Sequence, residues 1–204
     1  SFYINDIMNN KNSYSVILPT LNEVGHIKAL ILDISKIFIM SQSQYEIIIV
    51  DDNSTDGTLN EIKKISNLEI VVNQRIGKKK SLVRSFNEGI KIAKYNNIIW
   101  MDADYSHPPE LIQKFIDLNN KENNEIIVGS RFHKDSKRYY DDKKQKPVVI
   151  DLMSILLNKI CKFFLFNDFN DYTSGYICIK KNIIKNIELK GYYGDYFIIL
   201  ISIC

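Results

Sequence analysis

Short apolar runs alternate with helical patterns over the first two-thirds of the chain, and this alternation constrains the fold most strongly. Five runs rich in β-branched residues are predicted to be strands: 14–18, 47–50, 69–72, 98–101 and 126–128. Between them, apolar residues recur at a period near 3.6, which predicts helices. Strands and helices that alternate at this spacing predict an α/β fold with a mainly parallel sheet and helices on both faces.

Each predicted helix has one apolar face. The helical positions are Ile27, Leu30, Ile31, Ile34 and Phe38; Leu59, Ile62 and Ile65; and Leu82, Phe86, Ile90 and Ala93. A further helix is predicted to begin near Pro109, because proline suits the first turn. With 204 residues, of which 45% are hydrophobic, the chain can bury one core, so we expect a single domain preceded by a tail at 1–13.

The pattern changes after Ser130. Residues 133–146 are polar and charged without a period, and a loop of this length is usually functional or disordered. Residues 148–166 are apolar almost all round, which fits an interfacial helix at a membrane surface as well as a core helix or subunit contact. A turn into a strand at 172–179 and a short helix at 183–187 are predicted to follow.

Charge and cysteine content exclude some classes of protein. The formal charge is only +3, from 27 basic and 24 acidic residues, and predicts no nucleic-acid partner. Cys161, Cys178 and Cys204 are odd in number and contain no CxxC pair. We therefore expect reduced thiols in a cytosolic compartment rather than a disulfide framework or a zinc site.

Acidic residues gather where three predicted strands end. Glu23 follows the first strand, Asp51 and Asp52 the second, and Asp102 and Asp104 the fourth. Ligands of such sheets bind outside the carboxyl ends of the strands, and five carboxylates at one edge would repel one another unless a cation or hydrogen-bond donors offset them. Two Asp separated by one small residue suit an octahedral Mg²⁺ or Mn²⁺ that also holds phosphate oxygens.

The first two clusters, which include Asn22 and Glu23, lack a Gly-rich loop. They are therefore not expected to hold phosphate with backbone amides, but their carboxylates and amides can accept hydrogen bonds from a base N–H or from ribose hydroxyls. The structural alternative is that Asn22 and Ser54 cap helices and that Glu23 is a solvated acid in a first turn.

Five ordered motifs together resemble the family 2 glycosyltransferases, and within them the dolichyl- or polyprenyl-phosphate mannosyltransferase branch. They are 15–23 (SVILPTLNE), 49–58 (IVDDNSTDGT), 101–110 (MDADYSHPPE), 128–131 (VGSR) and 170–176 (NDYTSGY). The resemblance covers nearly the whole chain and implies a GT-A fold, with a nucleotide-binding half at 14–104 and an acceptor-side half at 105–204.

The resemblance also implies roles for individual residues. Pro19, Leu21, Asn22, Glu23, Asp51, Asp52, Asp102 and Ala103 would bind the nucleotide, while Asp102 and Asp104 would bind Mg²⁺ or Mn²⁺. Asp104 and Arg131 would be catalytic, and Arg131, Asp171, Thr173, Ser174 and Gly175 would form the sugar and acceptor side. Relatives of this branch often have Gln at position 106 and Arg at position 177, where this chain has Ser106 and Ile177.

The resemblance therefore implies an inverting, metal-dependent transferase that moves mannose or glucose from a nucleotide-diphosphate sugar to a polyprenyl or dolichyl phosphate. It would act in the cytoplasm, at the cytoplasmic face of a membrane and with peripheral membrane contact. Two alternatives stay open: a family 2 enzyme that glycosylates a non-lipid hydroxyl, and a non-catalytic module that binds sugar nucleotides. A nucleotidyltransferase is disfavoured, because residues 19–23 lack its Gly-rich basic loop.

Overall fold

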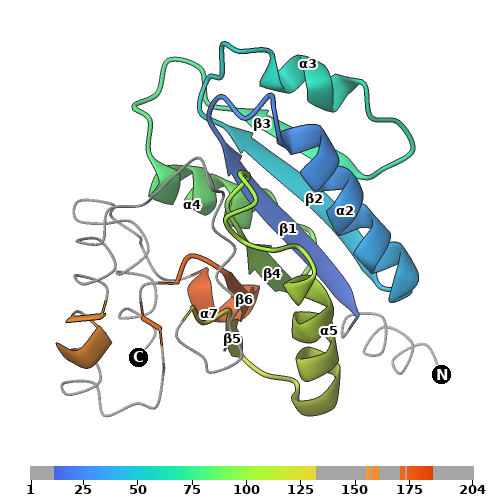
Figure 1. Ribbon diagram of the computed structural model, residues 1–204, viewed down its shortest axis with the longest axis vertical. Coiled ribbons are helices and arrows are strands. Elements are labelled where there is room, and N and C mark those ends of the chain that lie inside the picture. Colours follow the sequence, from blue (N-terminus) through green and yellow to red (C-terminus); the bar gives the residue numbers. More distant parts are fainter. Residues whose placement is uncertain (1–11, 132–154, 157, 161–170, 173, 186–204) are drawn as a thin grey trace.

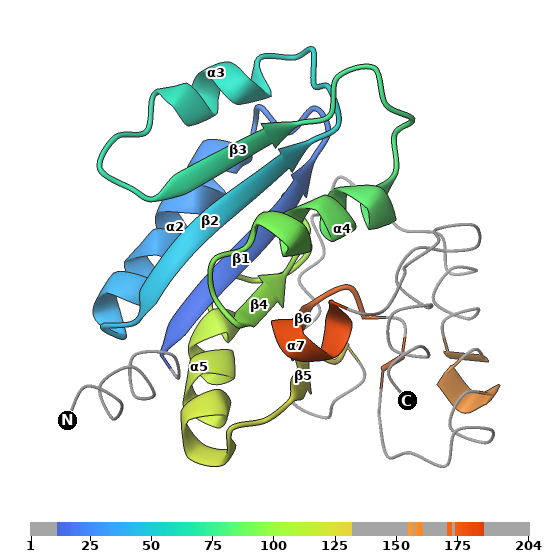
Figure 2. The ribbon, with the colours of Figure 1, turned by 180° about the vertical axis from the view of Figure 1, so that it is seen from behind.

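A six-stranded sheet forms the centre of the protein, and helices pack on both of its faces (Figures 1 and 2). The computed structural model describes residues 12–131, 155–156, 158–160, 171–172 and 174–185. The strands are β1 (Ser13–Thr20), β2 (Gln44–Asp51), β3 (Ile70–Gln74), β4 (Asn97–Trp100), β5 (Ile126–Val128) and β6 (Ile177–Lys180). The helices are α2 (Ile27–Met40), α3 (Thr58–Lys63), α4 (Leu82–Ile92), α5 (Leu111–Glu122) and α7 (Lys181–Ile184).

The predicted α/β architecture is confirmed. The strand order is β3-β2-β1-β4-β6-β5, and the β1–β2, β1–β4 and β2–β3 pairs are parallel. Helix α5 begins at Leu111, two residues after Pro109. The loop predicted at 133–146 lies outside the described residues, as does most of the segment 148–166, of which 155–156 and 158–160 are helical.

Alternating side chains of the strands build two cores, one on each face of the sheet. Val16 and Leu18 of β1 pack on the face that α2, α3 and α5 cover, whereas Ile17 packs on the face of α4 and α7 (Figure 2). The five apolar positions predicted for the first helix are all fully buried. Burial of both faces explains why the strands are continuous apolar runs rather than alternating ones.

Strand β6 lies between β4 and β5 and runs antiparallel to both. Its first residue, Ile177, pairs with Trp100 at the end of β4 and with Val128 at the end of β5. The segment that precedes β6 therefore lies at the same edge of the sheet as the segments that follow β4 and β5. This pairing brings the fourth and fifth sequence motifs to the edge where the first three end.

Helix α4 approaches β1 so closely that one position has no room for a side chain. A Cβ at Gly89 would lie 2.6 Å from Cγ2 of Ile17, which is buried in the core. We expect Gly89→Ala to lower the free energy of unfolding by about 1–3 kcal/mol, because overpacking outweighs the better helix propensity of alanine. Gly25→Ala is the matched control, since a Cβ there meets nothing within 4 Å. Urea unfolding of both variants checks this, and equal stability would contradict it.

None of the helices among the described residues is long and apolar enough to cross a lipid bilayer.

Candidate active site

Five segments meet at the carboxyl edge of the sheet. The ends of β1 and β2 are aligned there, because Thr20 pairs with Asp51, and Ile17 of β1 pairs with Trp100 at the end of β4. The loops that follow β1, β2, β4 and β5, and the segment before β6, are therefore neighbours. All predicted site residues that the structure describes lie on these segments or at the strand ends that lead into them; Thr173 lies outside the described residues.

The loops after β1 and β2 are joined by four hydrogen bonds. The backbone N–H groups of three consecutive residues in the first loop donate to side chains of the second: Asn22 to Ser54 Oγ (2.9 Å), Glu23 to Thr58 Oγ1 (2.8 Å) and Val24 to Asp56 Oδ2 (3.0 Å). In return, the N–H of Thr55 donates to Oδ1 of Asn22 (2.9 Å). Asn22 thus links two loops instead of capping a helix, and it does so at a left-handed φ of 61°.

We call these four hydrogen bonds between the two loops the brace. Asp56 is its acidic residue, and the pKa of the Asp56 carboxyl group is lowered. Partial desolvation raises the pKa, but hydrogen bonds from the Thr58 side chain, the Val24 N–H and the Thr58 N–H outweigh it. A carboxyl group with a lowered folded pKa stabilises the fold above its unfolded pKa of about 3.9, and this contribution is lost as pH falls through the folded pKa.

We therefore expect Asp56→Ala to be less stable than the wild type at pH 6 and to approach it in stability towards pH 3. Urea unfolding of both proteins at the two pH values measures this. Asp117→Ala, on the exposed side of α5, is the control. A stability difference that grows on acidification would contradict the prediction.

Asp51 is fully buried and accepts hydrogen bonds from within the protein. Its Oδ2 accepts from the hydroxyls of Thr20 (3.1 Å) and Ser54 (2.5 Å), and its Oδ1 accepts from the N–H of Ser54 (2.9 Å). Three donors offset the buried negative charge and fix the turn after β2. The carboxylate therefore shapes this loop, a role that the sequence analysis did not assign to it.

Asp52 forms a buried ion pair with Arg75, a residue that the sequence analysis missed. The Arg75 side chain is 1% exposed and also binds Glu88 Oε1 (3.2 Å) and Ser85 Oγ (3.0 Å). Asp52 accepts a second bond from the N–H of Ser81 (2.9 Å). Burial raises the pKa of Glu88, but hydrogen bonds from Lys78, Arg75 and Asn73 outweigh it and hold the pKa below its ordinary value.

The turn after β4 carries the Asp-x-Asp motif. Ala103 is 3% exposed and packs in the core, whereas Asp102 and Asp104 on either side of it are half-buried. Ser106 contacts both: its hydroxyl donates to Asp102 Oδ2 (3.3 Å) and its N–H to Asp104 Oδ1 (2.9 Å). The turn thus brings two carboxylates and the Ser106 hydroxyl together within five residues.

His107 holds this turn against the acceptor-side half. Its Nδ1 accepts a hydrogen bond from the N–H of Asp102 (2.9 Å), and its ring stacks on Tyr176, with centroids 5.0 Å apart and planes at 15°. The Tyr176 hydroxyl donates to the carbonyl oxygen of Pro108 (3.0 Å). These contacts give His107 a structural role, in line with its position before two prolines.

These contacts show what offsets the charge of two of the five carboxylates expected at this edge. Asp51 and Asp52 have protein donors of their own, and among the described residues no group of three His, Cys, Asp or Glu side chains could hold a metal ion. Asp102 and Asp104 still fit a hard divalent cation, because such ions take oxygen ligands and commonly use one or two carboxylates plus substrate phosphates and water.

Arg131 and Asp171 form an ion pair on the acceptor side. Arg131 donates to Asp171 Oδ2 through Nε (2.9 Å) and its backbone N–H (3.0 Å), and to Oδ1 through Nη2 (3.0 Å). The Asp171 side chain is fully buried, whereas that of Arg131 is 45% exposed. Two parallel bonds to a buried carboxylate fix the guanidinium at the rim of the site.

Ser174 and Gly175 are buried beside this pair. The hydroxyl of Ser174 donates to the carbonyl oxygen of Gly129 (2.5 Å) and accepts from the N–H of Tyr176 (3.2 Å). A Cβ at Gly129 would lie 3.1 Å from the Tyr176 ring. Close packing of these segments therefore connects the end of β5 to the start of β6.

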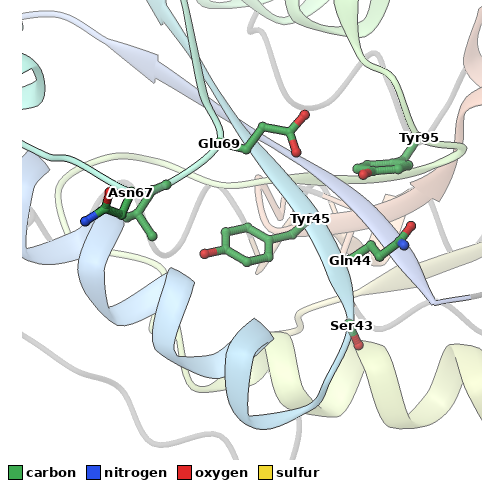
Figure 3. Close-up of a pocket in the computed structure, with 7 residues that line it drawn as sticks. Ser43, Gln44, Tyr45, Asn67, Glu69 and Tyr95 are labelled. Carbon is green, nitrogen blue, oxygen red and sulfur yellow. The ribbon is translucent and has the colours of Figure 1, made fainter.

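A groove of about 370 Å³ lies elsewhere, at the amino ends of β2 and β3. Figure 3 shows its lining, which includes Tyr45, Glu69 and Tyr95. It is separated from the acidic turns by the length of the sheet. None of the predicted site residues lines this groove.

Comparison with known proteins agrees with this geometry. The sequence model of the family described as Glycosyl transferase family 2 matches residues 15–188. A dolichol-phosphate mannosyltransferase of Pyrococcus furiosus is 32% identical over 179 residues, which are 86% of this chain and 48% of that protein. One from Mycosarcoma maydis is 33% identical over 129 residues, 59% of this chain and 42% of that protein. The chain thus spans about half the length of these two relatives.

Solved structures share the fold at lower identity. Glucosyl-3-phosphoglycerate synthase from Mycobacterium tuberculosis, in complex with phosphoglyceric acid, superposes with a TM-score of 0.68 at 17% identity, over 94% of this chain and 65% of that one. The same enzyme with Mn²⁺, uridine diphosphate and glucosyl-3-phosphoglycerate gives a TM-score of 0.67. With a family match over most of its length and the fold of glycosyltransferases of the GT-A type, this chain belongs to glycosyl transferase family 2.

Proposed function

We propose that the protein transfers a hexose, mannose or glucose, from a nucleotide-diphosphate sugar to a polyprenyl or dolichyl phosphate, with inversion at the anomeric carbon. The observation that carries the proposal is the carboxyl edge, where an Asp-x-Asp turn after β4 and a fixed arginine after β5 lie at the same edge of the sheet. Two relatives named dolichol-phosphate mannosyltransferase support the choice of acceptor. Because the matched regions are only 48% and 42% of those proteins, their activity bears on this chain only as support.

The donor would bind across the loops of the 14–104 half. Asp102 and Asp104 would hold Mg²⁺ or Mn²⁺, which would supply Lewis-acid stabilisation of the departing diphosphate. The complex of the M. tuberculosis synthase with Mn²⁺ and uridine diphosphate supports this cofactor class. The nucleoside would contact the more accessible nucleotide-binding candidates, Pro19, Leu21, Asn22 and Glu23, while the buried Asp51, Asp52 and Ala103 would shape the surface beneath it. The brace between the first two loops would keep that surface rigid before the donor arrives.

The acceptor phosphate would bind in the 105–204 half, at Arg131. One of its oxygens attacks the anomeric carbon while the bond from that carbon to the diphosphate oxygen breaks, and the electron pair of that bond leaves with the nucleotide. The second pKa of a phosphate monoester is about 6, so the nucleophile is largely dianionic near pH 7 and needs no general base. Asp171 would orient Arg131, and Ser174 and Gly175 would shape the surface next to it.

A lipid-linked acceptor places the reaction at a membrane, and we extend the proposal to its cytoplasmic face, where nucleotide sugars are available to a cytosolic domain. The segment 148–166, predicted as an interfacial or core helix, lies largely outside the described residues. It therefore remains a sequence-based prediction.

The proposal is tested in two steps. Calorimetric titration of GDP, UDP, GDP-mannose and UDP-glucose, each with Mn²⁺ and with EDTA, should show metal-dependent binding of one nucleotide class. Transfer of labelled hexose from that donor to a short-chain, water-soluble polyprenyl phosphate should then follow. If the donor binds and hexose is transferred to a glycan hydroxyl but not to the polyprenyl phosphate, the proposed acceptor class is wrong. Binding without any turnover would indicate a sugar-nucleotide-binding module.

A further inference from the structure

The loop 76–80, between β3 and α4, is a cationic and exposed part of the carboxyl edge. All five of its residues are exposed, and they comprise Ile76, Gly77 and the lysines Lys78, Lys79 and Lys80. The Ile76 side chain is 68% exposed, among the most exposed large apolar residues of the described chain. Figure 1 shows the loop projecting past the ends of the strands. The proposed chemistry uses none of these side chains.

The buried Arg75 side chain holds the backbone of this loop in place. Its guanidinium donates to the carbonyl oxygens of Lys79 (3.2 Å) and Ser81 (3.3 Å), and the N–H of Ser81 is bound by Asp52. Gly77 makes the turn at a φ of +69°, a conformation that L side chains rarely adopt. The lysines are therefore presented by a fixed backbone, and a partner need not order the loop when it binds.

Charge is concentrated at this place. The loop and its immediate support carry five positive groups, Arg75, Lys78, Lys79, Lys80 and Arg84, against two negative ones, Asp52 and Glu88, which gives +3. The whole chain has a formal charge of +3, so the remainder sums to zero. Lys78 pairs with Glu88 at 2.9 Å yet keeps 53% of its side chain exposed, and Lys79 and Lys80 extend the cationic surface.

We propose that the loop 76–80 is a docking surface for an anionic lipid membrane, which deepens the proposed function by bringing the carboxyl edge to the lipid that carries the acceptor. Lysines attract anionic headgroups, and an exposed aliphatic side chain between them can enter the boundary between headgroups and acyl chains. Val72, 46% exposed on the adjoining strand, adds apolar surface near the loop. The loop has no aromatic side chain on which a nucleic-acid base could stack, which disfavours a single-stranded nucleic acid.

Vesicle flotation tests the surface directly. The wild type should float with vesicles of phosphatidylcholine and phosphatidylserine. With vesicles of phosphatidylcholine alone, it should remain in the bottom fraction. Each lysine near an anionic surface adds roughly a factor of five, so Lys78→Gln/Lys79→Gln/Lys80→Gln should lower the partition coefficient on the order of 100-fold. Ile76→Ser should lower it further in the same background. Lys79→Glu/Lys80→Glu keeps the Lys78–Glu88 pair and should also abolish flotation.

A matched triple variant removes the same charge elsewhere. Lys28→Gln/Lys36→Gln/Lys63→Gln changes three exposed lysines on α2 and α3 and should keep nearly all of the partitioning. If both triple variants lose partitioning to the same extent, the vesicles attract the net charge of the protein and not this loop. That result would overturn the docking surface. Wild-type-like flotation of the loop variants, with unchanged melting temperatures, would also overturn it.

An activity assay separates this inference from the proposed function. The loop triple variant should transfer hexose to the short-chain, water-soluble polyprenyl phosphate at the wild-type rate and lose rate only with a long-chain acceptor in anionic vesicles. A wild type that floats but transfers to neither acceptor would refute the proposed function and leave the docking surface standing. A loop variant that works equally well on both acceptors would refute the docking surface alone.

Discussion

Replacing Asp104 with alanine is expected to abolish metal-dependent donor binding and to slow transfer by on the order of 1000-fold. The carboxylate is half-buried on a turn that hydrogen bonds of Ser106 and His107 hold in place. Loss of one of the two carboxylates proposed to hold the cation would remove charge stabilisation of the leaving diphosphate, which accounts for several kcal/mol in metal-assisted reactions. Calorimetry with Mn²⁺ and the nucleotide, followed by single-turnover transfer, measures both effects.

Two further variants show whether a loss of donor binding and transfer comes from the missing charge of Asp104. Asp104→Asn keeps the shape of the side chain and should be as inactive as Asp104→Ala, because it lacks the charge. Asp117→Ala, exposed on α5, removes a carboxylate outside the site and should bind and turn over donor normally. Unchanged donor binding and turnover in Asp104→Ala would refute the assignment of the metal to this turn.

Local sequence was enough to predict most of the fold. The strands 14–18 and 47–50 lie within β1 and β2, and the faces predicted from Ile27 to Phe38 and from Leu82 to Ala93 are buried, except for the half-buried Leu82. These elements could be predicted because burial on both faces leaves continuous apolar runs, and a helix on a sheet leaves a period of 3.6. The site followed from the same logic, since parallel strands end at one edge.

The pairing of β6 could not be predicted in this way. Residues 177–180 were expected to be part of a strand, but nothing local indicates that they insert between β4 and β5 in the antiparallel direction. Pairing depends on partners about fifty to eighty residues away in sequence. The resemblance placed Asp171 and Arg131 on the same acceptor side without pairing them, and the antiparallel insertion of β6 is the structural reason that they meet.

Which acidic residues are already bound by protein donors could not be predicted from the sequence either. From the sequence, Asp51 and Asp52 look as available to a ligand as Asp102 and Asp104, because each follows a predicted strand. In the structure, Asp51 and Asp52 are bound by hydroxyls, two backbone N–H groups and a buried guanidinium, while Asp102 and Asp104 lie half-buried on the turn after β4. An arginine just after an edge strand was the only signal for Arg75, and on its own it resembles a solvated surface residue.

Arg75 is therefore expected to be the residue whose loss most damages the fold at the site. In Arg75→Met, a side chain of similar length leaves Asp52 and Glu88 without their buried cation, and the carbonyl oxygens of the following loop lose a donor. Breaking a buried ion pair from one side costs about 3–5 kcal/mol. For a chain of this length, each kcal/mol lowers the melting temperature by about 2–4 °C, so we expect a decrease of about 10 °C.

A double-mutant cycle shows whether the loss comes from the unpaired acid. Asp52→Asn/Arg75→Met should be less destabilised than the sum of the two single variants, because removing the second charge relieves the first defect. Arg84→Met, exposed on the same helix as Ser85, should leave the melting temperature within about 1 °C, since isolated surface charges contribute little. Strict additivity in the cycle would mean that Arg75 acts through packing and not through Asp52. In the expected case, the nucleotide edge depends on a buried cation that neutralises one acidic residue, while Asp102 and Asp104 remain for the proposed metal.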